Sequence, residues 1–168
     1  GWSTETTGLV AGQAAMITHL HPMSTLSSSA LAMIVQQCLL SDHVVDSSRL
    51  KAIIDDTLGR LSQMYGGYGS VVDKFKHLVT LAVSLEDSPL PDWEIIEKRL
   101  GGGWVAEETL AIALFSVLRH IDDFKRCMIC SVNHGGDSDS TGAVAGNIIG
   151  AILGSEAIGE EFTGSLQL

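Results

Sequence analysis

The residues best suited to chemistry lie in one short segment near the C-terminus, NHGGDSDST, residues 133–141. Asp137 and Asp139 stand two positions apart there, and Ser140 and Thr141 follow directly. Two carboxylates about 4 Å apart repel each other by roughly 4 kcal/mol at an effective dielectric constant of about 20, and a helix N-terminus offsets only about 0.3–2 kcal/mol of that cost. A divalent cation would remove the repulsion, and carboxylate and hydroxyl oxygens suit Mg²⁺ or Mn²⁺ rather than zinc.

The same residues also fit a purely structural role, in which one aspartate caps the following helix and the other is solvated. Spacing alone does not separate the two interpretations. The pair Gly135-Gly136 favours the ligand site, because glycines let a backbone turn tightly and lie close to a bound molecule. Further on, glycines recur every four residues along one helix face, which predicts the close approach of another backbone: Gly142, Gly146, Gly150 and Gly154.

Helices must position this segment. Apolar residues recur at a spacing of three to four almost throughout the chain, and strand-like alternation is nearly absent. We predict helices over residues 7–20, 24–41, 46–65, 70–85, 92–100, 104–120 and 122–133 and from 139 onward. Ser24 or Thr25 is expected to cap the second helix, and Asp46 or Ser47 the third. The prediction is one all-α domain over residues 1–168, with short connections.

Charge and composition exclude several classes of partner. The net charge of −10 leaves no cationic surface for a nucleic-acid duplex. No apolar run reaches the roughly 18 residues that cross a bilayer, so we expect no membrane partner. Without a visible signal peptide, the expected location is cytoplasmic. Three cysteines do not suggest a disulfide scaffold, and Cys127-x-x-Cys130 is interpreted as two buried thiols rather than a redox or zinc pair.

For several other polar and aromatic residues, the sequence indicates the role less clearly. His134 either orients the loop before Gly135 or is an exposed turn residue. Trp104 follows three glycines and either forms the wall of a ligand pocket or enters the core. Glu107 and Glu108 fit the first turn of a helix, where the dipole favours negative charge. Exposed helix positions are expected for five residues: His43, His77, His120, Asp55 and Asp56.

Three segments, in the same order, resemble the ADP-ribosylglycohydrolase family of the dinitrogenase reductase-activating and ADP-ribosyl-acceptor hydrolase type. The segment NHGGDSDSTGAVAGNIIGAILG (residues 133–154) resembles the C-terminal signature of the family. THLHP (residues 18–22) and LGGGWVAEETLAIALFSVL (residues 100–118) resemble two earlier family segments. The resemblance implies a compact, orthogonal all-α fold and a binuclear magnesium or manganese site. It also implies cleavage of the glycosidic bond between ADP-ribose and an acceptor, which is a protein side chain or a small molecule.

The resemblance also implies roles for particular residues. Asp137, Asp139 and Ser140 match the metal ligands, and substrate binding is expected at four positions: His19, Gly135, Gly136 and Ser138. The implied partners are an ADP-ribosylated protein or a small molecule that contains ADP-ribose.

The family pattern has an earlier portion, with a catalytic glutamate and a Thr-Asp-Asp-Thr motif, that has no counterpart in this sequence. We therefore expect this chain to be the C-terminal portion of a longer fold, with the N-terminal portion as a partner and the general acid or base located there. The alternative is a non-catalytic helical module that binds ADP-ribose or a protein.

Overall fold

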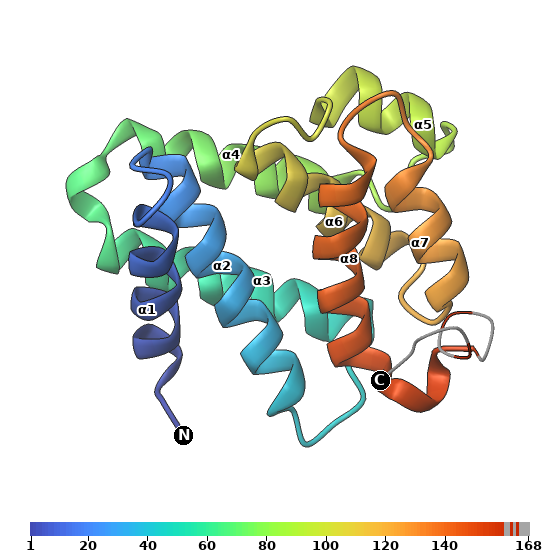
Figure 1. The fold of residues 1–168 in the computed structure, drawn as a ribbon, viewed down its shortest axis with the longest axis horizontal. Helices are drawn as coiled ribbons and strands as arrows, with labels where there is room; N and C mark the ends of the chain where they lie inside the picture. Colours follow the sequence, from blue (N-terminus) through green and yellow to red (C-terminus); the bar gives the residue numbers. More distant parts are fainter. Residues whose placement is uncertain (160–161, 163, 165–168) are drawn as a thin grey trace.

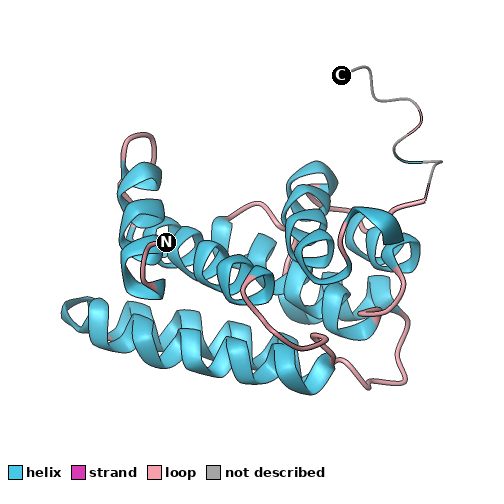
Figure 2. Cartoon of the chain, turned by 90° about the horizontal axis from the view of Figure 1, so that it is seen from below, coloured by secondary structure: helices cyan, strands magenta, loops and turns pink. Residues whose placement is uncertain are grey.

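The computed structural model of the chain describes residues 1–159, 162 and 164. These residues form helices joined by loops, with no strand among them, which confirms the all-α prediction (Figures 1 and 2). The α-helices are α1 (Thr4–Met16), α2 (Pro22–Leu39), α3 (Ser47–Met64), α4 (Ser70–Ser84), α5 (Asp92–Ile95), α6 (Ala106–Arg119), α7 (Phe124–Val132) and α8 (Ser138–Leu153). Shorter turns are η1 (Gly66–Tyr68), the π-helical turn η2 (Ile96–Leu100) that continues α5, and η3 (Ser155–Ala157).

The beginning of α2 differs from the prediction. His21, rather than Ser24 or Thr25, caps this helix, because its Nδ1 accepts a hydrogen bond from the Met23 amide at 3.2 Å. Pro22 follows as the first helical residue, where its fixed φ fits and its missing N–H costs nothing. Asp46 caps α3 as predicted, by accepting from the Arg49 amide at 2.8 Å.

The first helix is also displaced from its predicted position. The Ser3 hydroxyl accepts from the Thr6 amide and starts α1 at Thr4. The helix ends at Met16, so Thr18 and His19 lie in the loop before α2 and not in a helix. In Figure 1, α1 and α2 lie side by side at one edge of the molecule. This places the loop that carries His19 at the end of that pair.

The central element is α6, which contacts α2, α4, α7 and α8. Ten consecutive residues of this helix, Thr109–Leu118, are buried. A helix that is apolar all round its circumference can be stable only where other elements surround it. Because α6 packs against both α2 and α8, the loop that leads into α6 lies near these two helices.

The glycines of α8 meet side chains rather than the backbone that we predicted. A Cβ atom at Gly142 would lie 2.7 Å from Cγ1 of Val132 in α7, and one at Gly146 would touch Met128. No neighbouring atom lies within 4 Å of such a Cβ at Gly150. Gly154 ends the helix with a φ of 74°, a conformation that glycine adopts without strain. The packing against α7 is therefore tight at Gly142 alone, and at Gly146 it is an ordinary van der Waals contact.

All three cysteine thiols are free and buried, as predicted for the Cys127 and Cys130 pair. Burial raises the pKa of Cys38 to about 11 and the pKa of each of the other two to about 12. The prediction of an exposed position is wrong for His120, whose side chain is only 11% exposed at the end of α6. Within the described part of the chain, no helix is both long and apolar enough to cross a bilayer.

Candidate functional site

Two neighbouring cavities share a wall formed by Trp104, Val105 and Ala106 at the start of α6. The first cavity, of about 320 Å³, is lined on other sides by Asp137 and Ser140 among others. The second, of about 390 Å³, is lined by residues of the loop before α2 and the beginning of that helix, and by one residue of α6: His19, His21, Met23, Ser24 and Glu107. The structure therefore brings two of the three predicted metal ligands, Asp137 and Ser140, and the predicted substrate-binding histidine to two sides of one short segment.

Trp104 forms a wall and does not enter the core. Its side chain is 71% exposed, and it borders both cavities. It also lines a third cavity, of about 290 Å³, together with Gly135 and Gly136. An exposed indole ring between cavities offers a flat apolar face on which a base or sugar ring can stack. Of the two interpretations of this residue, the structure favours the ligand wall.

The predicted metal ligands lie at the beginning of α8. Asp137 is the residue directly before the helix and is half-buried, while Ser140 on the first turn faces the same cavity. Asp139 is exposed and is not part of that cavity wall. Its carboxyl is nevertheless close to that of Asp137. The neighbouring Asp139 carboxyl is the largest cause of a lowered pKa of Asp137, and hydrogen bonds from Ser140 add to the effect.

The loop that carries Asp137 is attached to the glycine-rich loop before α6 by a backbone contact. The Asp137 amide donates to the Gly102 carbonyl at 2.8 Å. A Cβ atom at Gly136 would overlap that same carbonyl oxygen. Gly136 is therefore needed for the approach of a second backbone, a reason that spacing along the chain could not reveal. Substrate binding by Gly135 and Gly136 stays a prediction.

Two glutamates hold these loops through backbone amides. The Glu108 carboxylate accepts from the amides of Gly102 and Gly103, both at 3.1 Å. The Glu97 carboxylate accepts from the Gly135 amide at 2.9 Å. Sequence reasoning assigned Glu108 only to the first turn of α6. The third helical position, where it stands, is also where a glutamate reaches back to amides that precede a helix.

His134 joins the end of α7 to the start of α8. Its Nδ1 accepts from the Gly136 amide at 3.1 Å, while its Nε2 lies 3.1 Å from the Ser131 carbonyl oxygen and 3.0 Å from the Thr141 hydroxyl. The buried Thr141 hydroxyl in turn donates to the Ser131 carbonyl at 2.7 Å. His134 therefore orients the loop that carries Asp137, the first of its two predicted roles.

The cavity beside Asp137 also contains a hydroxyl group that no sequence pattern indicated. Ser27 of α2 is only 5% exposed and lines this cavity, and its Oγ atom has no hydrogen-bond partner in the protein. A buried polar atom without a partner is costly unless water or a ligand satisfies it. No lysine or arginine is among the described residues that line the cavity.

The two remaining predicted residues are less closely associated with the cavities. The imidazole Nδ1 of His19 lies 2.8 Å from the Thr18 hydroxyl, and the side chain is exposed at the edge of the second cavity. Ser138 is half-buried, and its hydroxyl lies 3.5 Å from the carbonyl oxygens of His134 and Gly136. A substrate-binding role for each stays a prediction.

Comparison with known proteins adds independent information. A family model described as ADP-ribosylglycohydrolase matches residues 2–168. The chain is also similar to the ADP-ribosyl-[dinitrogen reductase] glycohydrolase of Rhodospirillum rubrum, with 54% identity over 37 residues. That match covers 22% of this chain and 13% of the relative, so it compares a short part of each protein. No solved structure matches the chain significantly.

Proposed function

Because the chain belongs to the ADP-ribosylglycohydrolase family, we propose that it takes part in cleaving the glycosidic bond between ADP-ribose and an acceptor, with the help of magnesium or manganese. The acceptor is a protein side chain or a small molecule. The observation that carries the proposal is the shared wall at Trp104, which separates a cavity lined by Asp137 and Ser140 from a cavity lined by His19.

The residues at the start of α8 fit a hard divalent cation. The Asp137 and Asp139 carboxyls lie near each other, and Ser140 supplies a hydroxyl on the same turn. These are oxygen ligands of the kind that magnesium and manganese prefer. When bound, such ions stabilise developing negative charge and lower the pKa of a bound water. We propose that Asp137, Asp139 and Ser140 hold them.

The chain's own residues would orient the substrate. The two cavities of about 320 and 390 Å³ are each in the size range of small-ligand pockets. We propose that the exposed Trp104 indole stacks against a ring of ADP-ribose, while His19 donates or accepts a hydrogen bond from the second cavity. The unpartnered Ser27 hydroxyl is available to a substrate hydroxyl or to a bound water in the first cavity.

The test measures release of ADP-ribose from an ADP-ribosylated protein by the full-length natural protein, with Mg²⁺ or Mn²⁺ and after chelation. We expect Asp137→Asn to reduce the rate by about 100-fold or more, since loss of even an outer partner of a metal ligand costs about 10–100-fold. Asp55→Asn is the matched control, because Asp55 is an exposed aspartate on α3. Full activity in Asp137→Asn, or after chelation, would contradict the proposal. Binding of ADP-ribose without release would support the non-catalytic alternative.

A further inference from the structure

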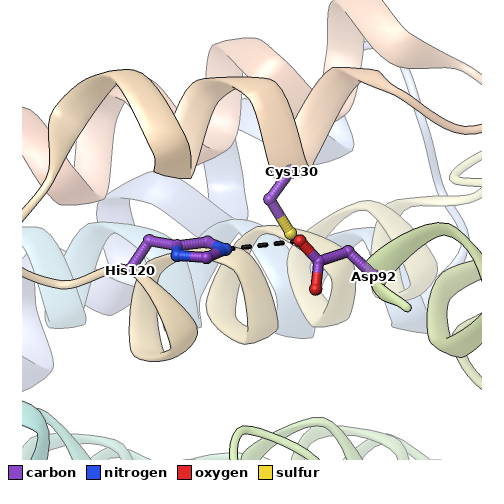
Figure 3. Close-up of side chains that lie close together, drawn as sticks. All are labelled: Asp92, His120 and Cys130. Carbon is purple, nitrogen blue, oxygen red and sulfur yellow. Dashed lines mark hydrogen bonds and ion pairs between the residues drawn. The ribbon is translucent and has the colours of Figure 1, made fainter. Parts of the chain in front are cut away.

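A second group of ligand-type side chains lies apart from the cavity that contains Asp137. Asp92 is the first residue of α5, His120 follows the last residue of α6, and Cys130 lies in α7. One ligand atom of each side chain lies within 4.8 Å of the other two (Figure 3). None of the three lines the cavity beside Asp137. The group therefore needs an explanation separate from the proposed glycohydrolase site.

The geometry is close to that of a tetrahedral metal site. With typical zinc bonds of about 2.0–2.3 Å, ligand atoms of such a site stand about 3.3–3.6 Å apart. The Nε2 atom of His120 already lies 3.3 Å from Oδ2 of Asp92. Figure 3 shows the Cys130 sulfur next to the same carboxylate. Because all three ligand atoms lie within 4.8 Å of one another, side-chain rotations would bring them to bonding distance of one ion.

Arg119 orients the carboxylate. Its Nε lies 2.6 Å from Oδ1 of Asp92, which leaves Oδ2 directed at His120. The guanidinium also donates to three backbone carbonyls of the loop before α5, those of Glu86, Ser88 and Leu90. Partners of this kind fix the orientation of metal ligands in many proteins. The carboxylate and a thiolate would together neutralise a divalent cation.

The ligand types select the metal. A thiol and an imidazole favour zinc and similar borderline cations over magnesium, which prefers oxygen. Cys130 is buried beside Ile112 and Phe115 in one of the apolar clusters of the fold, whereas Asp92 is one-third exposed and allows solvent to reach the group. Three protein ligands would leave one position for water. Burial raises the pKa of the Cys130 thiol to about 12, so binding must release its proton.

We propose that Asp92, His120 and Cys130 form a mononuclear site for zinc or a similar borderline divalent cation. The ion would join the start of α5, the end of α6 and the last turn of α7, three elements that are separate along the chain. Cys127, one helical turn earlier, is not a member, so the Cys-x-x-Cys spacing does not itself define the site.

The experiment is a titration of the metal-free protein with Co²⁺, followed by absorbance. We expect a single cobalt ion to give a thiolate-to-cobalt charge-transfer band and the strong visible bands of four-coordinate cobalt. We expect zinc but not magnesium to remove these bands. Cys130→Ala should abolish the charge-transfer band, while the matched variant Cys127→Ala should retain it. Asp137→Asn should also retain the band, which separates this site from the proposed glycohydrolase site.

A second variant keeps the test decisive if Cys130→Ala does not fold. His120→Gln leaves the thiol in place and should raise the dissociation constant for Co²⁺ by more than about tenfold. The proposal is overturned if the folded wild-type protein shows no charge-transfer band. It is equally overturned if the band persists in Cys130→Ala, or if His120→Gln binds cobalt as tightly as the wild type.

Discussion

Replacing Gly136 with alanine would put a methyl group against the carbonyl oxygen of Gly102. The carbonyl belongs to the backbone of Gly102, and the methyl group would be fixed rigidly to the backbone of residue 136, so no side-chain rotation can relieve the overlap. Forcing an extra methyl into a packed site costs about 1–3 kcal/mol. Separating the loops also breaks the hydrogen bond from the Asp137 amide to Gly102, worth about 0.5–1.5 kcal/mol. We expect Gly136→Ala to lower the free energy of unfolding by about 1.5–4.5 kcal/mol in total.

Two other glycines serve as matched controls. At Gly135 an added Cβ would meet only the flexible end of Glu97, at 3.2 Å, so alanine there should change stability by less than about 0.5 kcal/mol. At Gly59, inside α3, nothing lies within 4 Å, and alanine should stabilise the helix by about 1 kcal/mol. None of the three has a positive φ, so the comparison isolates the backbone contact.

The assay is urea unfolding followed by far-ultraviolet circular dichroism, which reports the free energy of unfolding of each variant. A titration with Mn²⁺ on the same samples tests the consequence for the proposed site. Because Gly136 precedes Asp137, Gly136→Ala should weaken Mn²⁺ binding, while Gly59→Ala should not. If Gly136→Ala is as stable as Gly135→Ala, the two loops do not touch as the structure shows, and the account of how Asp137 is positioned is refuted.

Two further predictions concern buried polar groups. Ser27→Ala removes a hydroxyl without a protein partner, so the free energy of unfolding should be unchanged or raised. The variant should bind ADP-ribose more weakly than the wild type, as measured by calorimetry. Equal affinity would show that the hydroxyl does not contact the ligand. The second concerns Cys127, whose pKa is raised from 9.0 to about 12. Between pH 9 and 12 the folded protein keeps the thiol proton while the unfolded chain loses it. The contribution of this group to the free energy of unfolding is therefore complete below pH 9 and decreases as the pH rises toward 12. Cys127→Ala should flatten that decline in urea unfolding between pH 9 and 12, and an unchanged slope would contradict it.

The paired loops show why positioning residues escaped sequence analysis. In the sequence, Glu108 and Glu97 look like ordinary charged residues on a helix surface. In the structure, each accepts hydrogen bonds from glycine amides in a loop next to the candidate site. The distance along the chain from Glu97 to Gly135 is 38 residues, so no local pattern connects them. A triple glycine followed by tryptophan did indicate an unusual loop, but its partner became known only when α6, α7 and α8 were packed together.

The sequence by itself determined the helices, the Asp46 cap, the burial of Cys127 and Cys130 and the segment that carries Asp137. These depend on local signals: apolar spacing, capping side chains and residue type, which act within a few residues. Tertiary structure alone decided that the Gly102 and Gly136 backbones touch and that Asp92, His120 and Cys130 meet. The physical reason is that such contacts depend on the angles and distances between packed helices. These angles and distances are set by the packing of many side chains that lie far apart in the chain.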